Sequence, residues 1–326
     1  MKAIKFFAIS AMAAAMITSC SSEDELSQSN YPSDNIIRVT AGVNNAKTRA
    51  EGAGTEMKND FSLTIVNKNA SKYTYTDKVF SKSSGDWACS ETLLWQKSDA
   101  LVDIVAFAPA QTGKFNGVYA EGSIQPITYS VAKDQTTADD KNDLLYYYAK
   151  DFNPGESLDK GKLNIKFNHA FCMIDINVTL GTEFNKPEVL KESPIVKVTL
   201  GGTKIAANVN VTNAASVVTA SEEAAATDIT TTKGSFDKAA DPEANAKSHF
   251  SCIAIPQTVG ANTFKVSLMT AGKRYEWTSD KEITLQSGYR YTLNLSMGND
   301  VVLLKGGSIS ATPWTEITSD KPLETD

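Results

Sequence analysis

The chain has 326 residues, of which 41% are hydrophobic and 21% are charged, and its formal net charge is −6. This length predicts about two domains, and the composition is that of a globular protein, not of a disordered or membrane-embedded one. Because nucleic-acid binding needs a basic surface, the negative balance argues against nucleic acid as a partner.

The first twenty residues have the pattern of an export signal. Two lysines precede an apolar stretch at residues 6–17, which is too short to cross a bilayer as a helix. Residues 17–20 (ITSC) resemble a bacterial lipobox, whose cysteine is acylated and becomes the mature N-terminus; an ordinary signal peptide with an incidental Cys20 is the alternative. The acidic run at residues 21–25 is similar to the tags of surface-exported lipoproteins in Bacteroidetes-type bacteria. We therefore expect a signal peptide at 1–19, a lipid on Cys20 and a location at the cell surface, on the outer membrane.

Beyond the signal, the sequence consists of short alternating segments. In the first of them Ile37, Val39, Ala41 and Val43 alternate with polar or small residues, so that an extended strand at 36–43 can bury one face. The same alternation recurs further along, at residues 61–65, 197–200, 263–269 and 289–295. Turn signals separate these segments, which predicts an all-β protein.

Three features predict how the mature chain is divided. Residues 152–157 (FNPGES) have the composition of a linker or wide turn, which predicts β-domains at 50–155 and 156–326. Apolar residues occupy odd positions up to Phe167 and even positions from Ala170 onward, which predicts a β-bulge next to His169. Residues 220–247 contain few large apolar side chains and are expected to form a mobile insertion.

Cysteine and histidine usage limits the chemistry. With Cys20 assigned to lipid, three cysteines remain, so that at most one disulfide can form. Cys172 and Cys252 lie in apolar runs and either pair or stay as buried thiols, and we expect thiols. His169 and His249 are the only histidines, and neither lies in a nucleophile, metal or acid–base motif. We therefore predict no catalytic residue, no metal ligand and no cofactor.

Several short motifs follow one another along nearly the whole chain. After the lipobox come IIRVT at 36–40, KTRA at 47–50, LW at 94–95, VAFAP at 105–109 and DLL at 143–145. The series continues with FNHA at 167–170, IPQ at 255–257, GYRY at 288–291, Ile309 and Trp314. In this order they resemble the fimbrillin-like family of Bacteroidales, the subunits of type V pili. The resemblance implies two tandem transthyretin-like β-sandwich domains.

The resemblance also implies a route of assembly. In this family an arginine-specific protease cuts behind an N-terminal strand, the strand leaves, and a strand from a neighbouring subunit satisfies the exposed groove. Carried over to this chain, residues 20–49 are a lipidated propeptide, the cut lies between Arg49 and Ala50, and the strand at 36–43 is displaced. Without the resemblance, a permanent edge strand and an ordinary exposed arginine would be the simpler interpretation.

The strand donated in this way is expected near the C-terminus. Residues 300–304 and 308–317 are the candidates, and on one face of the second lie Ile309, Ala311, Pro313 and Ile317, with Trp314 on the other. This segment either passes to the next subunit, as in a shaft subunit, or closes its own domain, as in a tip or anchor subunit.

The resemblance implies four partners: other pilin subunits, an arginine-specific protease, a receptor of unknown identity, and the outer membrane through the lipid. A surface glycan-binding lipoprotein is the alternative function, because such proteins share the lipobox, the acidic tag and β-sandwich modules. Its candidate stacking residues for sugar rings are Trp87, Trp95, Trp277 and Tyr146 to Tyr148. Aromatic residues in β-sandwiches also serve as core, which is the competing explanation.

Overall fold

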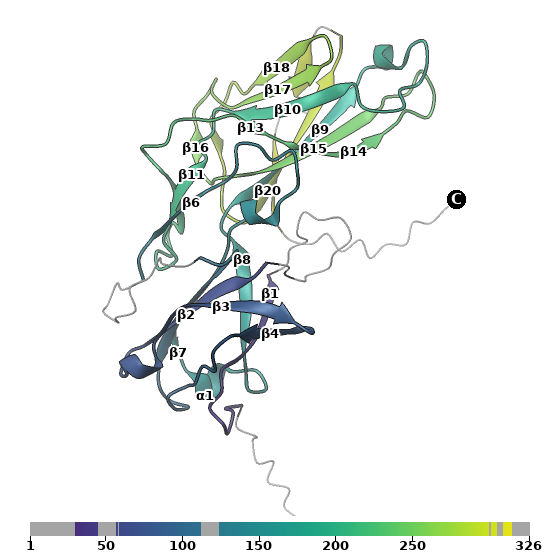
Figure 1. The fold of residues 1–326 in the computed structure, drawn as a ribbon. Coiled ribbons are helices and arrows are strands. Elements are labelled where there is room, and N and C mark those ends of the chain that lie inside the picture. The colour runs from purple at the N-terminus through teal and green to yellow at the C-terminus, as the bar shows by residue number, and fades with distance from the viewer. Residues whose placement is uncertain are drawn as a thin grey trace, which may run out of the picture.

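The structure is a computed structural model that describes residues 30–44, 57, 59–111, 124–299, 301–304 and 309–314. Strands dominate this part of the chain, which confirms the expected all-β class. Figure 1 shows two lobes stacked end to end, with β1 to β4 in one lobe and the later strands mainly in the other. None of the helices in the described ranges is long and apolar enough to cross a membrane.

The strands of the N-terminal lobe close into a ring around one core, in the order β1-β4-β3-β2-β5-β7-β8. Along β8 the side chains of Leu163, Ile165 and Phe167 are buried and those between them are exposed, as the two-residue period of a strand requires. The ring strands are β1 (Arg38–Val43), β2 (Phe61–Asn67), β3 (Tyr75–Ser83), β4 (Asp86–Cys89), β5 (Val102–Ala108), β7 (Leu145–Phe152) and β8 (Lys162–His169). Short helical turns lie between some of them: η1 (Ser71–Tyr73), η2 (Asp140–Asn142) and α1 (Pro154–Ser157).

The C-terminal lobe is built from several sheets that share a second core. Its largest sheet has the order β14-β15-β9-β20-β21, with β22 also paired to β20, and the others are β13-β10-β17-β18, β12-β11-β6 and β16-β19. The strands up to β14 are β6 (Ile127–Ser130), β9 (Cys172–Leu180), β10 (Ile195–Gly201), β11 (Ala206–Val209), β12 (Val218–Ala220), β13 (Ile229–Thr230) and β14 (Thr232–Asp237), with η3 (Thr182–Asn185) after β9. The remaining strands are β15 (Lys247–Ala254), β16 (Thr258–Val259), β17 (Lys265–Thr270), β18 (Arg274–Thr278), β19 (Ile283–Thr284), β20 (Tyr289–Met297), β21 (Val302–Leu304) and β22 (Ser310–Pro313).

Strand β5 connects the two cores. Ile104 and Ala106 belong to the core of the ring, whereas Val105 and Phe107 belong to the core of the C-terminal lobe. Both faces of β5 are therefore buried, which explains why its residues from Ile104 to Ala108 form an apolar run without alternation. The two lobes thus meet through a packed apolar interface.

The chain changes lobes at a different place from the expected domain boundary. Residues 152–157 form the end of β7 and α1, and the chain then returns to the ring as β8. Strand β6, which precedes β7 in sequence, pairs with β11 of the C-terminal lobe. The ring therefore ends at His169, and not at residue 155. The expected boundary was wrong because a Pro-Gly stretch specifies a turn but not which two elements the turn joins.

Two local expectations also differ from the structure. The change of apolar phase is not a bulge within one strand: β8 ends at His169, β9 begins at Cys172, and Ala170 and Phe171 carry the chain from the ring into the largest sheet. Residues 220–247 contain β13 and β14, which pair with β10 and β15. Because β14 is an edge strand with mostly exposed side chains, it needs few large apolar residues.

Candidate functional site

The segment that was expected to leave the fold is β1, which completes the ring between β8 and β4 (Figure 1). On one side β1 pairs in parallel with β8 over its whole length, from Arg38 beside Lys162 to Val43 beside Phe167. On the other side it pairs with β4 at a single position, Val39 beside Trp87. The strand therefore has one continuous ladder and one seam that is almost open.

The side chains of β1 and of the residue before it fill part of the ring core. Ile37 and Val39 are 6% exposed and Val43 is 7% exposed, while Ala41 is half-buried. Full burial of an aliphatic side chain contributes about 1.5–3 kcal/mol. Three such side chains are a large share of the ~5–15 kcal/mol that stabilises a typical domain, so the ring core is complete only with β1 in place.

Hydrogen bonds hold both ends of β1. At its start, the Arg38 guanidinium donates to the two carboxylate oxygens of Asp34, at 3.0 and 2.6 Å. These bonds, together with one from the Ile36 N–H, lower the pKa of Asp34 to about 2. At its end, the Asn44 N–H donates to the Phe167 carbonyl at 2.7 Å. Sequence reasoning missed the Asp34–Arg38 pair, because a four-residue spacing indicates side-chain contact only on a helix and this segment is a turn followed by a strand.

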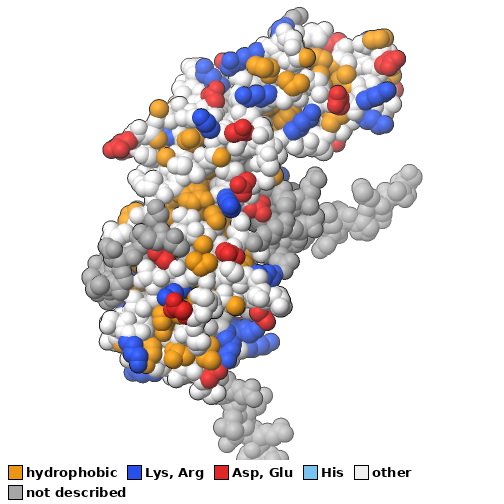
Figure 2. Space-filling model, in the orientation of Figure 1, with side chains coloured by type: hydrophobic (Ala, Val, Ile, Leu, Met, Phe, Trp, Pro, Cys, Tyr) orange, Lys and Arg blue, Asp and Glu red, His pale blue; other side chains and the backbone are white. Residues whose placement is uncertain are grey.

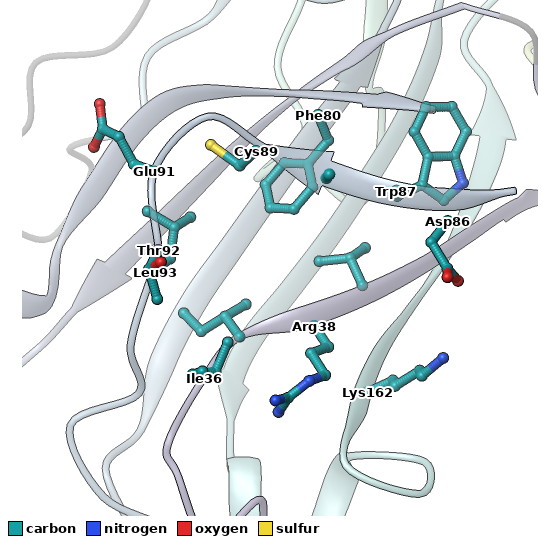
Figure 3. Close-up of a pocket in the computed structure, with 13 residues that line it drawn as sticks. Ile36, Arg38, Phe80, Asp86, Trp87, Cys89, Glu91, Thr92, Leu93 and Lys162 are labelled. Carbon is teal, nitrogen blue, oxygen red and sulfur yellow. The ribbon is translucent and has the colours of Figure 1, made fainter. Parts of the chain in front are cut away.

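An open pocket of about 520 Å³ lies in the seam between β1 and β4 (Figure 3). The pocket exists because β4 ends at Cys89. After β4, the next backbone bond to the N-terminal segment is the one that the Ile37 N–H donates to the Leu93 carbonyl, at 2.9 Å. The few residues between these points curve away from β1. The seam therefore separates two strand edges without an intervening strand.

The pocket combines an apolar floor with a charged rim. In Figure 3, Phe80 lies near its middle, Arg38 and Lys162 lie on the side of β1, and Asp86 and Glu91 lie on the side of β4. The Glu91 carboxylate is held by Lys78 at 2.7 Å. Apolar contacts flanked by strand edges are the features by which proteins bind an extended peptide.

The second candidate element is β22, near the C-terminus. It runs antiparallel to β20 of the same chain, from Ser310 beside Thr292 to Pro313 beside Tyr289, and all four of its side chains are exposed. Ala311 and Pro313, expected on an inward face, are among them, and Ile309 is half-buried. Backbone pairing is therefore the main attachment of β22 itself.

One buried side chain adds to this attachment. Trp314 follows β22, is 4% exposed, and stacks on His169 with ring centroids 3.7 Å apart. The His169 Nδ1 lies 2.7 Å from the Asp143 carboxylate. Burial, with the negative charges of Asp143 and Asp139, raises the pKa of the nearby Tyr129 to about 12.

This stacked pair carries an energetic cost. The Trp314 Nε1 and the His169 Nε2 are buried and have no hydrogen-bond partner among the described residues. Leaving a buried polar group unpaired costs about 1–3 kcal/mol, which offsets part of what stacking and burial of the indole contribute. Sequence reasoning assigned His169 to a bend and had no signal for its partner, because Trp314 is far away along the chain.

The cysteines and the candidate sugar-stacking residues serve the cores. Cys89, Cys172 and Cys252 form no disulfide with one another in the described part of the chain, and burial raises the pKa of the Cys172 thiol. Each aromatic candidate packs in or against one of the two cores: Trp87, Trp95 and Tyr147 in the ring, and Tyr146, Tyr148 and Trp277 in the C-terminal lobe. On the face in Figure 2, acidic and basic side chains are interspersed over both lobes. Cys20, Arg49, Ala50 and Ile317 lie outside the described residues.

Comparison with known proteins identifies the family. Residues 48–314 match the fimbrillin-like family, a span that includes most of the chain. The chain belongs to the fimbrillin-like family. This confirms the resemblance drawn from the order of the motifs. No curated protein sequence matches the chain significantly.

Solved structures share the fold of this fimbrillin-like chain. A candidate cell adhesion protein from Bacteroides ovatus is similar with a TM-score of 0.62 and 17% identity, over 86% of this chain and 97% of that one. A candidate cell adhesion protein from Bacteroides uniformis has a TM-score of 0.57 and 15% identity, over 87% and 100%. A fimbrial protein from Bacteroides vulgatus has a TM-score of 0.55 and 16% identity, over 86% and 99%. At these identities the likeness concerns the fold.

Proposed function

We propose that this fimbrillin-like protein is a structural subunit of a cell-surface fimbrium that serves adhesion. In this proposal its lobes are the two tandem transthyretin-like domains of the family, and it is exported as a lipoprotein, cut between Arg49 and Ala50 and assembled by donor-strand exchange. Family membership supports the role as a pilus subunit. The observation that carries the exchange step is the position of β1, which ends shortly before Arg49 and has a full ladder on β8 only.

Removal of β1 would create an acceptor groove. The outer edge of β8 would lose its partner from Lys162 to Phe167, and the sites filled by Ile37, Val39 and Val43 would be open to water. Unpaired strand edges and apolar pockets are both satisfied by an incoming strand. The seam beside β4 is where such a strand would find space to pair before β1 has fully left.

The proposed donor is the C-terminal segment that contains Ile309, Ala311 and Ile317. Its strand β22 exposes every side chain while it lies on β20, so that leaving β20 breaks backbone bonds and withdraws one buried side chain among the described residues of the segment, Trp314. In a tip or anchor subunit the same strand would stay on its own lobe.

Deleting residues 309–326 tests the donor assignment. After treatment with a trypsin-like protease, the wild-type protein should form ladders that survive mild detergent, whereas the shortened chain should form none. Mixed with wild type, the shortened chain should still accept a strand and so shorten the ladders, because its groove is intact. Ladders of unchanged length from the shortened chain alone would show that the donor lies elsewhere.

The lipid anchor has a separate test. Cys20→Ala should prevent fatty-acid labelling of the chain and reduce its amount on the cell surface, since the cysteine is the acylated residue in the proposal. Labelling with a fatty-acid analogue and surface proteolysis of intact cells measure the two effects, with Cys89→Ala as a control that should change neither. Normal labelling of the Cys20→Ala protein would contradict the lipoprotein assignment.

A further inference from the structure

The last residues of β8 contact the end of β1. Phe167 lies beside Val43 in the parallel ladder, and its carbonyl accepts the Asn44 N–H at 2.7 Å. The Asn44 side chain also donates from Nδ2 to the Asn168 Oδ1, at 3.1 Å. The end of β1 is therefore fixed to two consecutive residues of β8.

The next residue of β8 contacts the C-terminal segment. His169 stacks against Trp314 at an interplanar angle of 11°, and the backbone N–H of Trp314 donates to the Gly288 carbonyl at 2.6 Å. On its other side β8 pairs with β7 only at its last two residues, where His169 lies beside Leu145 and Asn168 beside Tyr146. The position of the imidazole thus depends on a short stretch of backbone that β1 and β7 hold from opposite edges.

We propose that residues 167–169 form a shared docking site for both ends of the folded chain, so that β1 and the C-terminal strand stabilise each other. When β1 is seated, its bonds to Phe167 and Asn168 hold the His169 ring in place for Trp314. When β1 leaves, β8 loses the ladder along its outer edge and no longer fixes the imidazole under Trp314, so that the C-terminal segment is held mainly by backbone bonds to β20 and to Gly288. By the reciprocity of coupled equilibria, loss of Trp314 loosens the end of β1 by the same factor.

This coupling would order the steps of assembly, a consequence that rests on the proposed function. A subunit that still holds β1 would keep its own C-terminal strand, and so could neither accept nor donate. Removal of β1 would open the groove and loosen the donor strand of the same molecule. Seated β1 would thus block both the acceptor groove and the donor strand before the cut, and its removal would release both.

Hydrogen exchange in the uncut full chain tests the coupling. Asn44→Ala removes the side-chain bond to Asn168 and should speed exchange of the amides of residues 310–312 and Trp314 by roughly 2- to 10-fold, the range for a single hydrogen bond. Asp34→Ala is the matched control, because it removes exposed hydrogen bonds at the opposite end of the same strand. It should leave exchange of the amides of residues 310–312 and Trp314 unchanged.

The reciprocal arm uses Trp314. Trp314→Ala should speed exchange of the Asn44 amide, whereas Trp314→Phe, which keeps a ring over His169, should preserve most of its protection. In the double variant Asn44→Ala, Trp314→Ala, the amides of residues 310–312 should exchange faster by less than the product of the two single effects. The reason is that each single change already breaks the shared contact. Unchanged exchange at the opposite end in both single variants, or an equal effect of Asp34→Ala, would overturn the proposal. Since uncut monomer is measured, this result is independent of whether cut protein polymerises.

Discussion

Replacing Lys47 and Arg49 together by alanine should keep the protein monomeric after treatment with a trypsin-like protease, while the wild type assembles into ladders. An attached strand has a high effective concentration at its own groove, so an external donor cannot compete with β1 until the chain is cut. β1 ends at Val43, and these two residues are the first basic positions after it. The readout is a ladder that survives mild detergent, together with the N-terminal sequence of the cut chain.

A matched variant separates the position of the cut from the loss of charge. Arg49→Lys keeps the positive charge and remains a substrate for a trypsin-like protease, so it should polymerise with that enzyme. With an arginine-specific protease the same variant should stay monomeric. Equal polymerisation of wild type and the double alanine variant would contradict control by this site. Absence of polymer from both would favour a capping subunit or the glycan-binding alternative, with the family fold unaffected.

The alternation of apolar residues was sufficient to predict the strands that bury a single face, such as β1, but not the doubly buried β5 or the strands within residues 220–247. Ile37, Val39 and Val43 could be assigned to one face because each element that buries a single face must repeat with a period of two. The same rule detected a change of phase after Phe167. It could not distinguish a bulge from a passage into another sheet, because both shift the pattern by one residue.

Pairings between distant segments were outside the reach of the sequence. Nothing local indicates that β6 joins β11, or that β1 runs parallel to β8, because such pairings are decided by how the elements pack. The contact between Trp314 and His169 is of the same kind. Trp314 was expected opposite Ile309 on a strand, but its burial depends on stacking against His169 at the end of β8, a contact that only the folded chain creates. The candidate site was therefore predictable as segments and not as contacts.

A chain that begins at Ala50 should be markedly less stable than one that begins at Asn30 and keeps β1. Loss of three buried aliphatic side chains removes on the order of 4 kcal/mol or more. At about 2–4 °C per kcal/mol for a chain of this size, the Tm of the ring should fall by roughly 10 °C. Alternatively, the shortened chain should oligomerise, because open grooves capture strands from other molecules. Calorimetry and light scattering measure the two outcomes.

Rescue by a peptide shows whether the loss belongs to the strand itself. A peptide of residues 36–44 should restore the Tm of the shortened chain, because it can re-form the ladder with β8 and refill the sites of Ile37, Val39 and Val43. The same peptide with Val39→Asp and Val43→Asp keeps the backbone groups but places two charges in an apolar core, so it should fail. A strictly monomeric chain from Ala50 that melts at the temperature of the longer chain would exclude β1 as a structural strand of the ring, and with it the acceptor groove.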